Sequence, residues 1–556
     1  MFKKNLDALS NAALKRRLEK INDFEAREGI SYIITPSNDY ILLKNDIPID
    51  DLNNPREAIK TQFKASIKNE MKSNDIIINF GIGLGYLLDE TFNNYPSRII
   101  VYEPDLKLLH FVLNNVDISE HLSSGRVYLT NDLDELLGKL NEIYLTKDKV
   151  EITYLQNYAV VYNKELLMLT QKVFDTCKTK MVDVNTIAKF SQRWLDNTLN
   201  NISSVNNGKA YLLSDLEDKF IGQSALILGA GPSLTDNIQK IKANRSRFVI
   251  FAVNKALKYL ESNGIYPDFA VCLDAGNMGT TLDVSPEYLA RINCIADIRT
   301  DKTLFTKTFN KVFLNFSDTD FLLKKLAETN NAIKFYSTGG SASIQALVSA
   351  VKMGFSKIVI AGIDLAFKDN IIYANGEVMN RISQEEIIVD SVSKNLVQVK
   401  SVNGGMVYTR SDYEAFIHQF ESIIKDLNYS NIYNLSTFGA SIEGVRPVNF
   451  ESLSLMVPAN TDILDSMRPF KFNFADFMQE EFLNINNVIA ILSKEVFSPE
   501  LVSAIVKSVL VYQYMQTEIL TVLQKNFEPQ IAEDFILKTK SAIKNIIDIL
   551  QKNKMI

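Results

Sequence analysis

The chain has 556 residues, of which 46% are hydrophobic and 23% are charged. This composition is typical of a soluble globular protein and excludes disordered, collagen-like and fibrous proteins. Sixty basic against sixty-six acidic residues leave a formal net charge of −6, which gives no overall basic surface for nucleic acid. At roughly 150 residues per domain, the length predicts three or four domains.

The cysteines and the apolar stretches indicate where the protein resides. Cys177, Cys272 and Cys294 lie far apart without a CxxC spacing, which favours a reducing compartment and argues against a metal knuckle. The N-terminal stretch, residues 1–23, carries charges throughout and has helical spacing, so we expect neither a secretory signal nor a membrane anchor. The longest apolar stretch, near residues 501–512, is too short to span a bilayer. We therefore expect a cytoplasmic protein without membrane insertion.

The first part of the chain has the pattern of a Rossmann-like unit. Two β-rich runs within residues 29–44 predict a small hairpin or sheet. The apolar run DIIIN is followed by the glycine turn at 81–85, a helical pattern, and the run RIIVY, which ends before Glu103. In such units the glycines admit a nucleotide or S-adenosylmethionine and the acid meets the ribose. A tight turn without any ligand gives the same pattern, so both interpretations stay open.

Residues 133–207 have a largely helical pattern and predict a connector that closes this first domain, with Trp194 in its core. A second unit follows, in which the apolar runs SALIL, RFVIFAV, FAVCL, NCIADI, KVFLNF and KIVIAGI alternate with helical segments. This alternation predicts a parallel sheet covered on both faces. Helical periodicity returns from about residue 470, and Ser498 followed by Pro499 predicts a helix start. We thus expect an α/β protein with domains at 1–207, 208–450 and 451–556, the last one helical.

Ligands of open parallel sheets bind at the carboxyl ends of the strands. Polar or glycine residues follow four predicted strands: the loop from Gly229 to Leu234, Asn254, Asp274 and Asp364. The loop contains Gly229, Gly231, Pro232 and Ser233 at a predicted helix N-terminus, a place that favours an anion. It lacks the lysine of a P-loop, so we expect one phosphate held by backbone amides and Ser233. The alternative is a turn in which Ser233 caps the helix.

A second glycine-rich turn could hold the other end of a mononucleotide. It comprises Ser337, Thr338, Gly339, Gly340 and Ser341. With both loops at one sheet edge, Asn254 would lie near the phosphate and Asp274 near the ribose. A buried carboxylate that accepts backbone N–H groups is the alternative for Asp274.

Other titratable residues suggest no site. The three histidines show no metal-ligand spacing, so we expect no metal, and the sequence around His418 is helical. Asp50 and Asp51 are expected on a solvated face.

Several strings within residues 224–446 give a specific resemblance: ALILGAGPSL, FAVNKALKYLESNGIYPDFAVCLDA, FYSTGGSASIQALVSAVKMGFSKIVIAGIDLAF, NGGMVYTRSDYEAF and GASIEG. In this order they resemble the motility-associated factor (Maf) family of flagellin glycosyltransferases, which share a domain with pterin pyrophosphokinase-like proteins. The N-terminal GIGLGY and IIVYEPD stretches resemble the first, Rossmann-like domain of that family. The segment 337–367 is also similar to bacterial sialyltransferases that use CMP-sialic acid.

The resemblance implies transfer of a nonulosonic acid, such as pseudaminic or legionaminic acid, from a CMP-activated donor to Ser or Thr hydroxyls of flagellin, without a cofactor. It assigns Gly229, Gly231, Ser233 and Asn254 to the CMP phosphate and ribose, and residues 337–341 to the cytosine side. Asp274 and Asp364 fall at strand ends of the family and are candidate bases. The related sialyltransferases use a histidine base, which has no clear counterpart here; Tyr373 stands near where related chains have a histidine. The base is therefore not identified.

Two alternatives belong to other functional classes. One is a pterin pyrophosphokinase-like enzyme that uses ATP and magnesium, in which Asp274 would bind the metal. The other is a non-catalytic flagellin chaperone that keeps a nucleotide-binding fold as a scaffold. Flagellin would bind the helical C-terminal domain in the transferase and in the chaperone. Association into a homo-oligomer is compatible with each of these functions.

Overall fold

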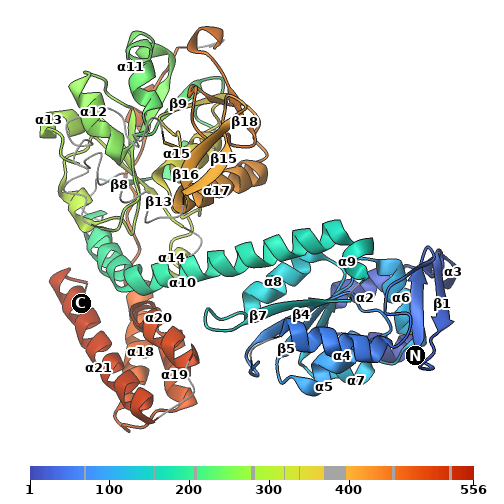
Figure 1. Ribbon diagram of the computed structural model, residues 1–556. Coiled ribbons are helices and arrows are strands. Elements are labelled where there is room, and N and C mark those ends of the chain that lie inside the picture. The colour runs from blue at the N-terminus through green and yellow to red at the C-terminus, as the bar shows by residue number, and fades with distance from the viewer. Residues whose placement is uncertain are drawn as a thin grey trace. The chain divides into compact units, whose positions relative to one another are not determined.

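The computed structural model describes residues 1–555 except 68–69, 156, 206–209, 277–281, 318–319, 337–338, 368–395, 454–457 and 525–528 (Figure 1). The chain forms two compact units, Met1–Ala188 and Lys189–Ile556. It passes from the first to the second within the long helix α10 (Asn163–Val205). The predicted domain boundaries at 207 and 450 stay predictions, because they divide the chain at other places than these units do.

A four-stranded parallel sheet forms the centre of the first unit. Its strands are β4 (Ile76–Phe80), β5 (Arg98–Tyr102), β6 (Val127–Thr130) and β7 (Val150–Tyr154), in the order β6-β5-β4-β7. This order confirms the Rossmann-like prediction. The expected largely helical stretch over residues 133–207 is present, and it is interrupted at β7, which pairs with β4. The surrounding helices are α4 (Pro55–Ser66), α5 (Tyr86–Asn94), α6 (Leu106–Asn115), α7 (Ser119–Ser123), α8 (Leu133–Ile143) and α9 (Tyr158–Val161).

The N-terminal segment precedes this sheet. It forms two helices, α1 (Phe2–Ala8) and α2 (Ala12–Leu18), because Asn11 caps the second by accepting the N–H groups of Ala13 and Leu14. After α3 (Asp23–Ala26), the predicted small sheet is present as antiparallel β1 (Ile30–Ile34), β2 (Tyr40–Lys44) and β3 (Ile47–Pro48).

A nine-stranded parallel sheet is the framework of the second unit. Its order is β18-β17-β14-β9-β10-β11-β12-β13-β8. The strands are β8 (Ala210–Leu212), β9 (Ser224–Leu228), β10 (Val249–Val253), β11 (Phe269–Cys272), β12 (Asn293–Asp297), β13 (Val312–Asn315), β14 (Lys357–Ala361), β17 (Ile432–Asn434) and β18 (Val445–Pro447). The predicted α/β fold with a parallel sheet is therefore confirmed.

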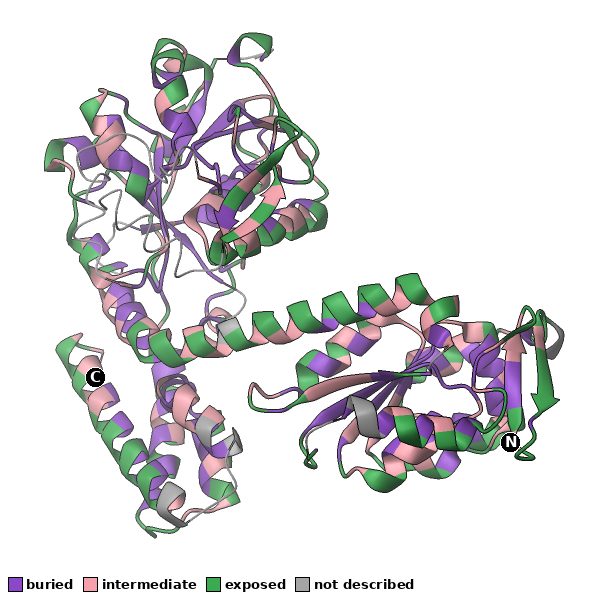
Figure 2. Cartoon of the chain, in the orientation of Figure 1, coloured by how far each residue is buried: buried purple, intermediate pink, exposed green. Residues whose placement is uncertain are grey.

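Both faces of this sheet are covered, which explains why its strands are continuous apolar runs. Along β9, Ala225 and Ile227 belong to one hydrophobic core, while Leu226 and Leu228 belong to the core on the opposite face. Helices α15 (Ala342–Lys352) and α17 (Ser411–Leu427) contribute to the first core. Helices α11 (Ser233–Ala243), α12 (Leu257–Ser262), α13 (Pro286–Leu289) and α14 (Phe321–Glu328) contribute to the second. The strands from β9 to β13 are buried at every residue, and Figure 2 shows this buried centre of the sheet.

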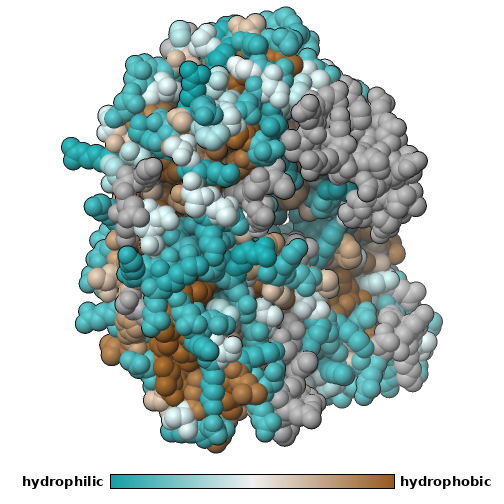
Figure 3. Space-filling model, turned by 90° about the vertical axis from the view of Figure 1, so that its left-hand side faces the viewer, coloured by the Kyte–Doolittle hydropathy of each residue, from teal (hydrophilic) through white to brown (hydrophobic). Residues whose placement is uncertain are grey.

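The C-terminal helices α18 (Ala475–Leu492), α19 (Pro499–Lys507), α20 (Val509–Gln524) and α21 (Pro529–Lys552) confirm the predicted helical end. Ser498 caps α19 as expected, with its hydroxyl oxygen accepting the N–H of Leu501 at 3.3 Å. These helices share their hydrophobic core with the sheet face that carries Leu226 and Leu228. Apolar residues also reach the surface among polar ones in the lower part of Figure 3; exposed examples on these helices are Leu483 and Leu537. Among the described residues, no helix is both long and apolar enough to cross a membrane.

Candidate functional site

The strand order defines where a ligand would bind in the second unit. Strand β9 lies between β10 and β14, and the chain builds the sheet outward from β9 in one direction before it returns to place β14 on the other side. In open α/β sheets, the crevice at the carboxyl ends of the strands lies at such a switch point. The loop after β9 begins with Gly229, and Asp364 follows β14. Both segments therefore lie at the carboxyl edge of the sheet, where the sequence predicts them.

The glycine loop after β9 packs directly against the loop after β14. The N–H of Gly229 donates to Ala361 at 2.8 Å, and the N–H of Gly231 donates to Gly362 at 2.7 Å. A Cβ on Gly229 would collide with the carbonyl of Gly362, and one on Gly231 would collide with the carboxylate of Asp364. These glycines are thus required by close backbone approach within the protein.

Ser233 and Asp364 form the centre of a buried network at this point. The Asp364 carboxylate accepts the N–H of Ser233 at 2.8 Å and the hydroxyl of Ser436 at 2.6 Å. The hydroxyl oxygen of Ser233 in turn accepts the N–H of Gly362 at 2.8 Å. Burial raises the pKa of the Asp364 carboxyl, although the hydrogen bonds from both serines favour its charged form.

This network changes the interpretation of the glycine loop. Ser233 is only 1% exposed, and its N–H at the start of α11 already binds a carboxylate. Ser233 therefore exposes no group that could make the expected contact with a phosphate in this structure. The alternative of a capped turn describes this loop better, although Asp364 and not Ser233 supplies the capping carboxylate. Pro232 is buried beside it at the helix start.

Asn254 and Asp274 follow the next two strands along the sheet. Asn254, 7% exposed, comes directly after β10. Asp274 follows β11 and is exposed; its side-chain oxygen accepts the N–H of Gly276 at 2.8 Å. The alternative of a buried carboxylate is therefore wrong for Asp274, which is open to a ligand.

The second glycine loop leads into α15. Ser337 and Thr338 lie outside the described residues, as does Tyr373. Gly339 and Gly340 have φ angles of +53° and +70°, and a Cβ on Gly340 would meet no atom of the described residues within 4 Å. Ser341 precedes α15 without a side-chain cap bond. Because α15 packs against β10 and β11 and ends shortly before the first residue of β14, its N-terminus faces the carboxyl edge of the sheet, the edge at which Asn254 and Asp274 follow their strands.

A charged cluster at the ends of β12 and β13 was missed by the sequence analysis. The guanidinium of Arg299 donates two hydrogen bonds to Asp297, both at 2.9 Å, and lies 3.6 Å from Asp320. It also lies 5.0 Å from the ring centroid of Trp194. Burial raises the pKa of Asp320 despite the nearby guanidinium. The only sequence signal is an acid and an arginine two positions apart at the end of an apolar run.

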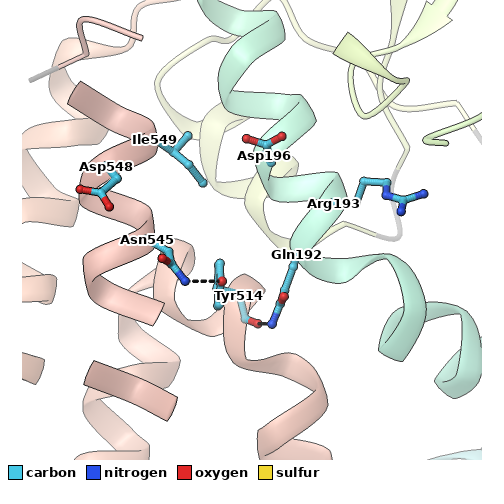
Figure 4. A pocket seen from close by; sticks show the side chains of 7 residues that line it. All are labelled: Gln192, Arg193, Asp196, Tyr514, Asn545, Asp548 and Ile549. Atoms are coloured by element: carbon cyan, nitrogen blue, oxygen red, sulfur yellow. Dashed lines mark hydrogen bonds between the residues drawn. The ribbon is translucent and has the colours of Figure 1, made fainter. Parts of the chain in front are cut away.

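An open cleft of about 460 Å³ lies between α10 and the C-terminal helices (Figure 4). Its lining residues are Gln192, Arg193 and Asp196 from α10, Tyr514 from α20, and Asn545, Asp548 and Ile549 from α21. No sequence pattern indicates this cleft, because its walls come from segments more than 300 residues apart.

The glycine turn of the first unit is filled by the protein's own side chains. The Glu103 carboxylate accepts the N–H of Ile82 at 3.0 Å and the hydroxyl of Tyr158 at 2.6 Å. A Cβ on Gly81 would lie 2.6 Å from the Tyr158 ring. Burial outweighs these hydrogen bonds and raises the pKa of Glu103 to about 7. The acid expected at a ribose is thus bound to the loop, which favours the interpretation as a turn without a ligand.

Asp50 lies against the same turn, at Gly83, and not on the solvated face that was predicted for it. The prediction of a solvated face is wrong for Asp50, which is 3% exposed and has one carboxylate oxygen without a hydrogen-bond partner among the described residues. Burial raises its pKa to about 7. Asp51 is more exposed and accepts the N–H groups of Asn53 and Asn54, which lower its pKa.

Comparisons with known proteins agree with this architecture. Residues 196–370 match the family model described as 6-hydroxymethylpterin diphosphokinase MptE-like. The structure of a MAf glycosyltransferase from Magnetospirillum magneticum AMB-1 is similar over 99% of this chain and 94% of that chain, with a TM-score of 0.67 and 16% sequence identity. An uncharacterized protein of Treponema pallidum (strain Nichols) is 27% identical over 123 residues, which are 22% of this chain and 57% of that protein. The predicted resemblance is therefore confirmed at the level of the fold.

Proposed function

We propose that the protein is a glycosyltransferase that moves a nonulosonic acid from a CMP-activated donor to Ser or Thr hydroxyls of flagellin, and thereby supports flagellar assembly and motility. The observation that carries the proposal is the likeness to a Maf glycosyltransferase along 99% of the chain. The strand-end residues that the resemblance assigns to the donor also lie along one edge of one sheet.

The chemistry of the edge supports donor binding near Asn254, Asp274 and the start of α15. A CMP-linked sugar carries its own leaving group, so the enzyme has to stabilise the departing phosphate and position a hydroxyl. The first N–H groups of α15, which no side chain of the described residues caps, suit the phosphate, with Gly340 leaving room for its approach. The N-terminus of α11 is less suited, because Asp364 binds there.

Asp274 is the better candidate for the general base. Its carboxylate is exposed at the sheet edge, whereas Asp364 is buried and bound by two serines. We assign Asp364 the role of a positioning residue, which holds the two loops of the switch point together. No cofactor enters this reaction.

The test uses the purified full-length protein, unmodified flagellin and CMP-pseudaminic or CMP-legionaminic acid. We expect the intact mass of flagellin to rise by increments of one sugar, with release of CMP and with activity retained in EDTA. No mass increase with either donor would contradict the proposal.

A pterin diphosphokinase is the second candidate, because the matching family model covers residues 196–370. Such an enzyme would transfer diphosphate from ATP to a hydroxymethylpterin and would need Mg²⁺ to neutralise the phosphates. Formation of AMP from ATP that depends on both the pterin and Mg²⁺ would favour this function over the transferase.

A further inference from the structure

Helix α10 is attached to the carboxyl edge of the sheet. The side-chain amide of Asn197 donates to the carbonyl of Ala275 at 3.1 Å and to that of Arg299 at 2.9 Å. The amide of Asn201, one turn further, donates to Ile298 and Thr300. These carbonyls belong to the segments that follow β11 and β12. The cleft formed by the preceding turn of α10 therefore lies beside the edge at which Asp274 is exposed.

Arg193 connects this cleft with the Asp274 loop. Its Nη1 atom lies 3.6 Å from the point that a Cβ on Gly276 would occupy, and the Oδ1 atom of Asp274 lies 3.2 Å from that point. In Figure 4 the Arg193 side chain extends from α10 away from the residues of α21. One side chain thus lines the cleft and approaches the loop of the candidate base.

Apart from Arg193, the polar groups that line the cleft on α10, α20 and α21 are mainly hydrogen-bond acceptors. The Gln192 amide donates to the carbonyl of Tyr514 at 3.5 Å, and the Asn545 amide donates to the Tyr514 hydroxyl at 2.8 Å. Within the described part of the chain, the side-chain oxygen of neither amide has a partner. Asp548 adds an exposed carboxylate. Asp196 pairs with Lys302 at 2.6 Å. A ligand that contacts these groups has to bring N–H and O–H donors.

The volume and the charge of the cleft identify its occupant. About 460 Å³ falls within the range of roughly 300 to 1,000 Å³ that small ligand sites span. On the α21 side of the cleft, the Asp548 carboxylate would repel the phosphate and the sugar carboxylate of the donor and would bind backbone N–H groups and Ser or Thr hydroxyls, while the Arg193 guanidinium extends away from this side. We infer that this cleft holds an extended, hydroxyl-bearing segment of the acceptor polypeptide and directs it toward Asp274. The inference rests on the proposed function.

Charge reversal at one position tests this acceptor subsite. Asp548→Arg fills the cleft and removes an acceptor at an exposed position, so the fold is retained. Glu533→Arg is the matched control, because it makes the same change at an exposed position of α21 about 22 Å along the helix. For each full-length variant, the KM for unmodified flagellin and the Kd for CMP are measured by transfer assays and calorimetry.

We expect at least a tenfold rise in the KM for flagellin with Asp548→Arg, an unchanged Kd for CMP, and wild-type values with Glu533→Arg. Equal KM values for the two variants would overturn the inference. A weakened affinity for CMP in Asp548→Arg would also overturn it, because the cleft would then belong to the donor. Absence of transfer by the wild-type protein would contradict the proposed function itself and is a separate result.

Discussion

The carboxylate of Asp364, after β14, accepts the backbone N–H of Ser233 at the start of α11 at 2.8 Å. A helix N-terminus favours an anion, and here the protein supplies that anion from its own neighbouring strand. The glycine loop after β9 therefore serves to bring two strand ends together. Under the proposed function, the start of α15, which no side chain of the described residues caps, is the candidate place for the donor phosphate.

Replacement of Asp364 by asparagine tests this structural role. The amide would place an NH₂ group or a weaker acceptor opposite the Ser233 N–H and the Ser436 hydroxyl, which both donate to the carboxylate. We expect Asp364→Asn to lower the free energy of unfolding by about 1–3 kcal/mol in urea titrations. Asp283→Asn, at an exposed carboxylate, should leave it unchanged. Equal stabilities of the two variants would show that the buried network contributes nothing.

The glycine turn of the first unit can be tested with two substitutions that have a similar backbone cost. Gly81 and Gly125 both have positive φ angles, +91° and +74°, but a Cβ would meet the Tyr158 ring only at Gly81. We expect Gly125→Ala to cost about 1–2 kcal/mol through its backbone alone. Gly81→Ala should cost roughly 1–3 kcal/mol more through the collision. Thermal or urea unfolding measures the difference, and equal losses would mean that Tyr158 does not fill the turn.

Asp50 predicts a specific pH dependence of stability. Its pKa in the folded protein is about 7, above the usual value of 3.8, so the folded state keeps a proton that the unfolded state loses between about pH 4 and pH 7. This group therefore makes the free energy of unfolding fall as pH rises through that range, and the effect levels off above pH 7. Asp50→Asn removes this contribution.

The comparison of Asp50→Asn with the wild type isolates this effect from other carboxyl groups. We expect the stability gain of the variant over the wild type to grow from pH 4 to pH 7 and then to stay constant. Urea titrations at several pH values give this difference, and Asp46→Asn is the control at an exposed position nearby. A difference that does not change with pH would mean that Asp50 is ionised in the folded protein at pH 4.

Asp274→Asn addresses the transfer step. The residue is exposed, so the substitution should leave the unfolding transition unchanged. Loss of a general base should lower kcat about 10²- to 10⁴-fold, while the Kd for CMP stays within about twofold. Transfer assays with purified flagellin measure kcat. Wild-type kcat in the variant would exclude Asp274 as the base.

The sequence predicted the strands and their ends well, because apolar runs followed by glycine or polar residues mark buried parallel strands directly. The sequence does not predict which residues contact each other at those strand ends. Ser233 and Asp364 are 131 positions apart, and only the strand order places them together. The predicted contact of Ser233 with a phosphate therefore did not take into account that Ser233 is buried.

The sequence also does not predict which single acidic residue is buried. Asp50 and Asp51 are identical neighbours in the sequence, yet only Asp50 packs against the glycine turn at Gly83. The cleft between α10 and α21 depends on the packing of distant helices and has no local pattern. Local patterns thus predicted the elements of the site, and tertiary packing determined which of their polar groups stay open to a ligand.

The intact mass of flagellin from the host tests the central claim most directly. Flagellin is compared from cells with the wild-type protein, from cells without it, and from cells with Asp274→Asn alone. We predict that the sugar-sized mass increments are present in the first and absent or strongly reduced in the other two. The same mass in cells with and without the protein would contradict its role as a flagellin glycosyltransferase.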